Sequence, residues 1–301
     1  MAHIHPPRLQ AGATIGVAAV SGPVDESRLS AGVSALESRG YRVVCAANVH
    51  ARTRFLAGSD RERADGYREL LRNPDVDAIF FARGGYGSAR ILQHLEPRDL
   101  IERPRIHLGS SDLTALFAFA ARAGLVTFYG PMVAAAMAVD EDLDWEAVLS
   151  GQTPATHRVA DKDILAGGAG EGPLVGGCLS LAASVAGTPE QIDGQGAVFF
   201  WEDVGEEAYR LDRMLTQLER SGTFDRLQAM IIGSISPGAR GGESTETAAG
   251  WLADRFAGAP FPVVRRFPAG HMPGSRTLPL GVPVRVDAER GVVEFSEAGV
   301  T

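Results

Sequence analysis

The chain has 301 residues, of which 45% are hydrophobic and 22% are charged. This globular mixture can bury a sizeable core without help from metals or disulfides. The formal net charge of −8 argues against a broad nucleic-acid-binding or membrane-surface role. No run approaches the roughly 18 apolar residues of a membrane span, and the first ten residues lack an apolar signal region. We therefore expect a soluble cytoplasmic protein without nucleic-acid or membrane partners.

The first half of the chain alternates short apolar runs with amphipathic stretches. We expect strands at 13–20, 41–46, 77–82, 105–109 and 126–129, and helices at 26–39, 60–72 and 112–123. Strands separated by helices predict a parallel sheet that is buried on both faces. In such a sheet, active groups gather where the carboxyl ends of strands meet the following loops.

The second half has a different pattern, after a weakly periodic connection at about 139–172. We expect an apolar helix that begins after 174–177 and ends at 186, strands at 197–201 and 229–234, helices at 208–221 and 245–256, and a closing hairpin of 282–286 and 292–295. This pattern predicts mixed α/β structure with more antiparallel pairing. We therefore predict an α/β protein with two domains, 1–150 and 151–301.

Cysteine and histidine spacing gives no support to a metal site. Cys45 and Cys178 lie outside any CxxC pair or Cys/His cluster, among apolar or small residues, so we expect both to be buried, inert thiols. No HExxH or EF-hand pattern appears. We expect neither a metal nor another cofactor.

Ser111 follows a predicted strand and precedes a predicted helix, in the segment Gly109-Ser110-Ser111-Asp112. A hydroxyl at such a turn projects from the sheet edge, and the helix N-terminus favours developing negative charge nearby. The same segment also fits an ordinary helix N-cap, which is the preferred interpretation of this segment taken alone. Ser110 is a competing choice for either role.

A glycine-rich loop, Arg83-Gly84-Gly85-Tyr86-Gly87-Ser88, directly follows the predicted strand at 77–82. Glycines let the backbone approach a ligand and aim N–H groups at it. The loop therefore suits a phosphate cradle or part of an oxyanion hole, although it matches neither GxGxxG nor the P-loop. A plain glycine-rich turn remains an equal alternative.

Two later segments offer a carboxylate and a histidine. Carboxylates follow the predicted strand at 197–201, at positions Glu202, Asp203, Glu206 and Glu207. One of them could orient a histidine, or all could form a solvated acidic loop. His271 lies in a loop fixed by Gly and Pro, which suits a general base; a structural or exposed histidine is the alternative.

Read in order, these segments resemble a known family. ARGGYGS, GSSDLTAL, WEDVGEEAYRLDRMLTQL and FPAGHMPGSRTLPLG resemble signature blocks of the LD-carboxypeptidase family of serine peptidases. GATIGVAAVSGP, FLAGSDRERA and GGCLSL also look like family segments, so the resemblance spans nearly the whole chain. One departure is Cys178, which stands where family members often carry Asn, outside the triad positions.

The resemblance implies a Ser–His–Glu triad of Ser111, His271 and Glu202. It implies an oxyanion hole, which we place at the backbone N–H groups of Gly85 and Asp112. We expect Arg83, Gly84 and Tyr86 to bind substrate, although Arg83 could instead pin its loop. The implied fold has an N-terminal parallel-sheet lobe carrying the nucleophile and a C-terminal mixed lobe with antiparallel strands carrying Glu and His. The active site is expected in the cleft between these lobes.

The implied activity is hydrolysis of an L–D amide bond. The expected substrate is a small peptide, the murein tetrapeptide, which would lose its terminal D-alanine during peptidoglycan recycling. A homodimer is the family expectation. Two alternatives remain open: a microcin-immunity-type serine peptidase that cleaves a peptidyl-nucleotide, and a non-catalytic muropeptide-binding protein.

Overall fold

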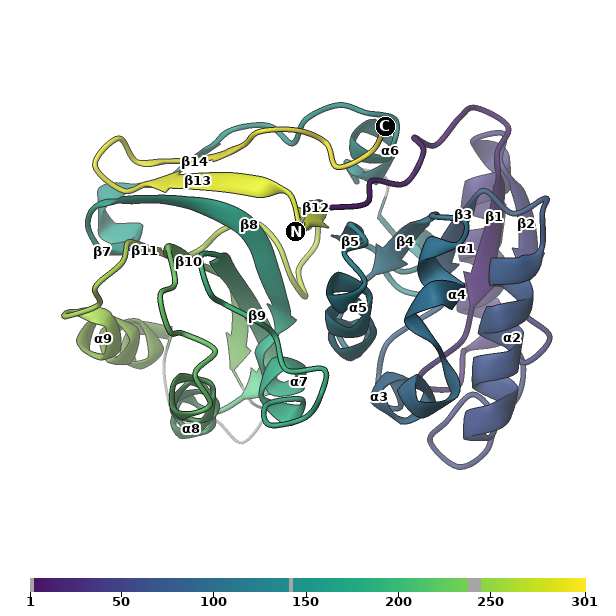
Figure 1. Cartoon of the computed structure of the whole chain (residues 1–301), viewed down its shortest axis with the longest axis horizontal. Helices are drawn as coiled ribbons and strands as arrows, with labels where there is room; N and C mark the ends of the chain where they lie inside the picture. The colour runs from purple at the N-terminus through teal and green to yellow at the C-terminus, as the bar shows by residue number, and fades with distance from the viewer. Residues whose placement is uncertain (1–2, 141–142, 238–244) are drawn as a thin grey trace. The chain divides into compact units, whose positions relative to one another are not determined.

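The computed structural model describes residues 3–140, 143–237 and 245–301. The chain forms two compact units, which Figure 1 shows with their elements labelled. The first unit comprises Met1–Gln152, Pro273–Gly281 and Ala298–Thr301, and the second comprises Thr153–Met272 and Val282–Glu297. The first unit is therefore discontinuous in sequence, because two short late segments return to it.

The first unit contains a six-stranded sheet, in the order β12-β5-β4-β3-β1-β2 among the described residues. The strands are β1 (Thr14–Ala18), β2 (Arg42–Cys45), β3 (Ala78–Phe81), β4 (Ile106–Gly109), β5 (Thr127–Tyr129) and β12 (Leu278–Leu280). The first five pair in parallel, as the sequence predicts. The late strand β12 adds to β5 in the antiparallel direction (Figure 1).

Helices connect these strands. They are α1 (Glu26–Ser38), α2 (Asp60–Arg72), α3 (Ser88–Ile91), α4 (Pro97–Ile101), α5 (Leu113–Arg122) and α6 (Trp145–Leu149), with 3-10 turns η1 (Leu92–His94) and η2 (Ala136–Ala138). Helix α2 shows why the sequence folds this way locally. Ser59 and Glu62 form a capping box at its start, which satisfies two orphan N–H groups. Apolar residues on one face of α2 are then buried, including Leu70 and Leu71.

The order of the strands places three loops together. Strands β1 and β3 are neighbours in the sheet, although β2 lies between them in the sequence. The chain direction across the sheet therefore reverses at this pair, and such a switch point is where open α/β sheets bind ligands at the carboxyl ends of their strands. The loops after β1, β3 and β4 start at this edge, and they carry Ser21, the glycine-rich loop and Ser111.

The second unit contains an eight-stranded mixed sheet, in the order β6-β14-β13-β8-β9-β10-β11-β7 among the described residues. The strands are β6 (His157–Arg158), β7 (Ile164–Ala166), β8 (Ala169–Cys178), β9 (Val198–Glu206), β10 (Ala229–Pro237), β11 (Val263–Val264), β13 (Pro283–Asp287) and β14 (Val292–Phe295). The helices are α7 (Leu179–Ser184), α8 (Ala208–Arg220), α9 (Thr245–Phe256) and the 3-10 turn η3 (Asp161–Asp163). Strands β8 to β11 pair in parallel and the others are antiparallel, which confirms the mixed fold.

The stretch 139–172 differs from the expected irregular connection. Its described part holds α6, β6, η3, β7 and the start of β8. Elements of two to five residues carry too little periodicity to be recognised in a sequence. The long strand β8 also runs through 174–177, and helix α7 begins only at Leu179.

The two cysteines have different environments. Cys178 is buried as expected, but Cys45 is exposed, so the prediction of a buried thiol at Cys45 is wrong. Strand β2 lies at the edge of the first sheet, and most of its residues face solvent. An apolar local sequence could not reveal that edge position, because it depends on the order of the strands.

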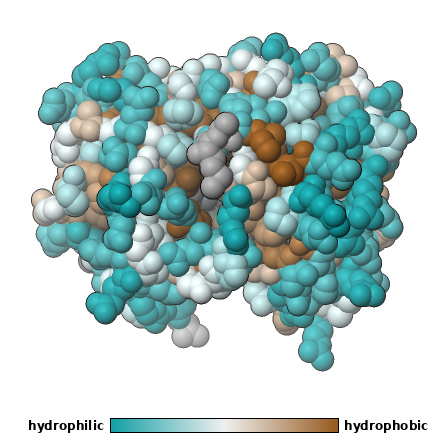
Figure 2. All heavy atoms as spheres, viewed as in Figure 1, coloured by the Kyte–Doolittle hydropathy of each residue, from teal (hydrophilic) through white to brown (hydrophobic). Residues whose placement is uncertain are grey.

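Within the part of the chain that the structure describes, no helix is long and apolar enough to cross a bilayer. Hydrophilic residues dominate the face shown in Figure 2, with apolar residues scattered among them.

Candidate active site

Ser111 occupies a tight turn between β4 and α5. Its φ is +60°, in the left-handed region that residues with a Cβ adopt rarely and at a cost in free energy. The N-cap of α5 is Asp112, and no side-chain cap bond forms there. The structure therefore does not show Ser111 as an ordinary helix cap, which was the preferred interpretation of this segment alone. A strained serine between a strand and a helix is instead the geometry of a nucleophile elbow.

The glycine-rich loop packs directly against Ser111. A methyl group placed on Gly84 would lie 2.9 Å from Ser111 Cβ and 3.0 Å from its Oγ, closer than real side chains approach. Gly85 and Gly87 have φ values of +112° and +128°, which glycine tolerates and other residues do not. The loop thus needs glycine both for its backbone path and for its contact with the serine.

The predicted oxyanion donors are two backbone N–H groups, at Gly85 and Asp112. Neither donates to another group within the described residues. The methyl position on Gly84 lies 3.5 Å from Asp112 N, so the loop runs beside that amide as well as beside the Ser111 side chain. The Asp112 N–H therefore lies beside the part of the loop that contacts the serine.

Arg83 holds this loop by hydrogen bonds. Its Nε donates to the Gly84 carbonyl at 3.3 Å and its Nη1 to the Pro23 carbonyl at 3.1 Å. The Gly22 N–H donates to the same Gly84 carbonyl at 3.2 Å. These contacts fit the alternative in which Arg83 pins the loop. Tyr86 is half-exposed and its ring lies 5.9 Å from that of Phe55.

The Asp112 side chain ties three loops together, a role that the sequence reasoning missed. Its buried carboxylate accepts from Ser21 Oγ at 2.5 Å and from the Ser88 N–H at 2.7 Å. Ser88 Oγ in turn donates to the Asp112 carbonyl. Residues after β1, β3 and β4 therefore share one carboxylate next to Ser111. No local pattern signals these contacts, since the partners lie 24 and 91 positions from Asp112.

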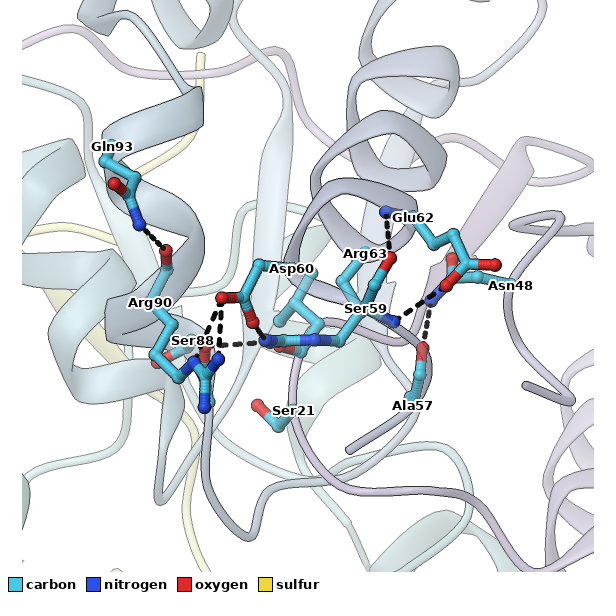
Figure 3. Close-up of polar contacts among 12 residues, drawn as sticks. Ser21, Asn48, Ala57, Ser59, Asp60, Glu62, Arg63, Ser88, Arg90 and Gln93 are labelled. Atoms are coloured by element: carbon cyan, nitrogen blue, oxygen red, sulfur yellow. Dashed lines mark hydrogen bonds and ion pairs between the residues drawn. The ribbon is translucent and has the colours of Figure 1, made fainter. Parts of the chain in front are cut away.

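Arg63 of α2 lies close to Asp60, Ser88 and Arg90 (Figure 3). Its side chain is fully buried and donates to the Val20 carbonyl and, at 2.7 Å, to the Gly87 carbonyl. Asp60 accepts from Arg63 and, at 2.8 Å, from Arg90. A buried guanidinium is costly unless paired in this way. Arg63 thereby joins the start of the loop after β1 to the end of the glycine-rich loop.

In the second unit, Glu202 and His271 form a close pair. Glu202 lies on β9 and is completely buried. Its Oε2 accepts from the His271 backbone N–H at 3.0 Å and contacts His271 Nδ1 at 2.8 Å. A carboxylate only accepts hydrogen bonds, so Nδ1 carries the proton and Nε2 is the basic nitrogen. Of the four candidate carboxylates, Glu202 is the one that the structure brings to His271.

Gly270 makes this approach possible. Its φ is +119°, and a methyl group there would lie 2.6 Å from Glu202 Oε2 and 2.5 Å from Ser234 Oγ. A larger residue would therefore push the histidine loop off the carboxylate. The glycine before His271 is needed for contact as well as for backbone conformation.

The pKa of His271 is raised above its ordinary value. Burial is the largest influence and lowers the pKa, but the hydrogen bond to Glu202 and the charges of Glu202 and Asp203 outweigh it. The buried Asp203 carboxylate accepts from the N–H groups of Ser180 and Val204, each at 2.8 Å; burial raises its pKa. Cys178 pairs with Glu202 across β8 and β9, and burial raises the pKa of its thiol.

No group of three or more His, Cys, Asp or Glu side chains could hold a metal ion in the described ranges. The first unit provides a strained serine next to the Asp112 N–H, and the second provides an imidazole oriented by a carboxylate. Acyl transfer by a serine uses groups of these kinds.

Comparison with known proteins gives the family. The model of the LD-carboxypeptidase N-terminal domain matches residues 15–130, and that of the LD-carboxypeptidase C-terminal domain matches residues 171–286. This chain belongs to the LD-carboxypeptidase family. The predicted resemblance is thereby confirmed, and the two matched regions contain Ser111 and the Glu202–His271 pair.

Relatives support this assignment along the whole chain. A Streptomyces coelicolor protein named as a putative carboxypeptidase is 40% identical over 96% of this chain and 95% of its own length. A Bacillus subtilis protein named as a probable murein peptide carboxypeptidase is 33% identical over 98% of this chain and 95% of its own length.

Solved structures share the LD-carboxypeptidase fold. A muramoyltetrapeptide carboxypeptidase from Oxalobacter formigenes has a TM-score of 0.80 at 31% identity, covering 94% of this chain and 97% of its own. The microcin C7 self-immunity protein MccF, an Escherichia coli protein, has a TM-score of 0.89 at 25% identity, covering 99% of this chain and 100% of its own. Both kinds of family member therefore share the fold of this chain.

Proposed function

We propose that this protein is a serine-type LD-carboxypeptidase that removes the terminal D-alanine from murein tetrapeptide. The observation that carries the proposal is the left-handed backbone of Ser111, in a chain that matches both domains of the family. Strained residues such as this serine cost free energy and cluster at functional sites, so the strain at Ser111 supports a catalytic role. The names of two relatives, one a murein peptide and one a muramoyltetrapeptide carboxypeptidase, suggest the substrate class.

The proposed mechanism uses a triad of Ser111, His271 and Glu202. His271 Nε2 takes the proton from Ser111 Oγ as the oxygen attacks the scissile carbonyl carbon, and the Gly85 and Asp112 N–H groups stabilise the resulting oxyanion. The tetrahedral intermediate expels the D-alanine amine, which takes the proton from the imidazolium. Water activated by His271 then hydrolyses the acyl-enzyme. Glu202 keeps the proton on Nδ1 throughout, as its 2.8 Å contact favours.

The proposal assigns the first unit as the nucleophile-bearing domain and the second as the domain that supplies Glu and His. It requires Ser111 Oγ and His271 Nε2 to come within about 2.6–3.2 Å of each other in the substrate complex. We further propose that Arg83, Gly84 and Tyr86 contact the substrate, that the enzyme acts in cytoplasmic peptidoglycan recycling, and that it works as a homodimer.

Mass spectrometry of a tetrapeptide digest tests this function. We expect the wild-type protein to release one alanine, and Ser111→Ala to release none while keeping its circular dichroism spectrum and melting temperature. Ser110→Ala is the matched control, because Ser110 is the neighbouring hydroxyl, and it should retain activity. Hydrolysis by Ser111→Ala at the wild-type rate would contradict the assignment, and tight binding of the tetrapeptide by the wild-type protein without turnover would favour a binding protein.

An immunity-type peptidase is the second candidate, and the extensive structural similarity to MccF favours it. Both candidates use the same nucleophile, so the substrate is what separates them. Parallel assays with a murein tetrapeptide and an aminoacyl sulfamoyl adenosine would compare kcat/KM for the two classes. We expect the tetrapeptide to be preferred; a preference for the nucleotide would select the second candidate.

A further inference from the structure

Two peptide groups flank Ser111, and each is held by hydrogen bonds. In the peptide that joins Ser110 to Ser111, the N–H donates to the Tyr129 hydroxyl oxygen at 3.0 Å, and the carbonyl accepts from the Leu113 N–H at 3.2 Å. In the next peptide, the Ser111 carbonyl accepts from the Thr114 N–H at 3.0 Å and from Thr114 Oγ1 at 2.7 Å. The remaining N–H of that second peptide belongs to Asp112, the proposed oxyanion donor.

The angle between these two peptide planes is set by the backbone torsions of Ser111. At a φ of +60° a residue with a Cβ is strained, and such strain persists only where the surroundings hold it. The bonds from Leu113 and Thr114 come from the first turn of α5, which starts two residues after Ser111, so they are local to the turn. These two local hydrogen bonds would move with the turn if Ser111 left the left-handed conformation, so they cannot hold it there by themselves.

Tyr129 provides the contact that is not local. It lies 18 positions away in sequence, at the end of β5, where it pairs with Gly109 of β4. Tyr129 is only 1% exposed, and β5 is flanked by strands on both sides. The hydroxyl is therefore fixed by the sheet itself, and it anchors the Ser110–Ser111 peptide to that frame.

We propose that Tyr129 is a positioning residue for catalysis. By accepting the Ser111 N–H, its hydroxyl oxygen holds the nucleophile in the left-handed conformation and so aims the Asp112 N–H at the oxyanion. The same hydrogen bond keeps the Ser111 N–H pointed at Tyr129 and away from the oxyanion. This inference rests on the proposed role of Ser111 as the nucleophile.

Tyr129→Phe removes the hydroxyl and leaves the ring. Tyr67→Phe is a matched control in the same unit, because Tyr67 is also fully buried and its hydroxyl has no partner within the described residues. We expect Tyr129→Phe to lower kcat about 10- to 100-fold, the cost of misplacing a reacting group by up to roughly 1 Å. KM and the midpoint of the pH–rate profile should stay unchanged, and Tyr67→Phe should match the wild-type protein.

The labelling rate of Ser111 by a fluorophosphonate separates failure of this inference from failure of the proposed function. If the wild-type protein neither hydrolyses the tetrapeptide nor is labelled at Ser111, the proposed function is wrong and the inference falls with it. If the wild-type protein is active and Tyr129→Phe reacts and turns over equally fast, only the inference is wrong. A shifted pH midpoint, or equal losses in both Tyr→Phe variants, would also overturn it.

Discussion

Replacement of Gly84 by alanine tests the contact between the glycine-rich loop and the serine. The added methyl group would lie 2.9 Å from Ser111 Cβ and 3.0 Å from Oγ, whereas carbon atoms in contact prefer about 3.5–4.0 Å. One of the two groups must retreat by roughly 0.6–1.1 Å. Asp112, the next residue, is itself buried, so the displacement falls on the serine or on the loop.

Either displacement harms the proposed reaction. A shift of this size in a reacting group costs up to about 100-fold in rate, and overpacking costs typically about 1–3 kcal/mol of stability. We therefore expect Gly84→Ala to lower kcat/KM for the tetrapeptide by about 10- to 100-fold, with a smaller effect on folding. Steady-state kinetics and urea denaturation measure the two effects separately.

The control for Gly84→Ala is Gly167→Ala. Gly167 has no heavy atom within 4 Å of the added methyl position and has no left-handed backbone. It should therefore keep wild-type activity and stability. Wild-type kcat/KM in Gly84→Ala would refute the reasoning, because it would mean that the loop and the serine can separate without consequence.

Further predictions concern His271 and the carboxylates Glu202 and Asp112. Glu202→Gln should lower kcat and move the midpoint of the pH–rate profile to lower pH. The carboxylate that raises the His271 pKa is then lost, while burial still disfavours the imidazolium. An unchanged midpoint in a full pH–rate profile would contradict this prediction. In the wild-type protein the rate should rise with pH through a midpoint above the ordinary histidine value of about 6.5. The stability that the Glu202–His271 pair contributes is fully present at pH values below the ordinary histidine pKa, and it is lost as the pH rises through the raised pKa of His271. Asp112→Ala should cost about 2–5 kcal/mol of unfolding free energy in urea, since it leaves two buried donors unpaired, whereas the exposed Asp65→Ala should cost under about 1 kcal/mol; equal losses would refute the anchoring role.

Strands β1, β3, β4 and β5 of the first unit could be predicted from sequence because each is a short, mainly apolar run that becomes fully buried. Strands β1, β3 and β4 show this pattern without a break. The edge strand β2 has an apolar sequence too, yet it faces solvent. Sheet order is a property of the whole chain, so the exposure of Cys45 could not be inferred from its neighbours.

The candidate site could likewise be predicted only in part from local sequence. His271 stands out because glycines and prolines surround it in the sequence, and Ser111 stands out because it follows a predicted strand and Gly109 and precedes a predicted helix. The groups that support them have no such mark. Asp112, Arg63 and Tyr129 act through partners that lie 18 to 91 positions away, and their residue types are ordinary for a helix start, a helix and a strand.

Each unit orients its own part of the proposed triad by contacts within that unit. In the first, the Tyr129 hydroxyl and the glycine-rich loop contact the strained Ser111, and the carboxylate of the next residue, Asp112, ties the neighbouring loops together. In the second, Gly270 lets His271 reach Glu202, which accepts two hydrogen bonds from that histidine. Preorganisation of this kind means that little reorientation of individual side chains is needed during the reaction. The glycines at positions 84 and 270 therefore matter to the proposed triad as well as its reacting side chains, because a methyl group at either position would force apart a triad residue and the loop that packs against it.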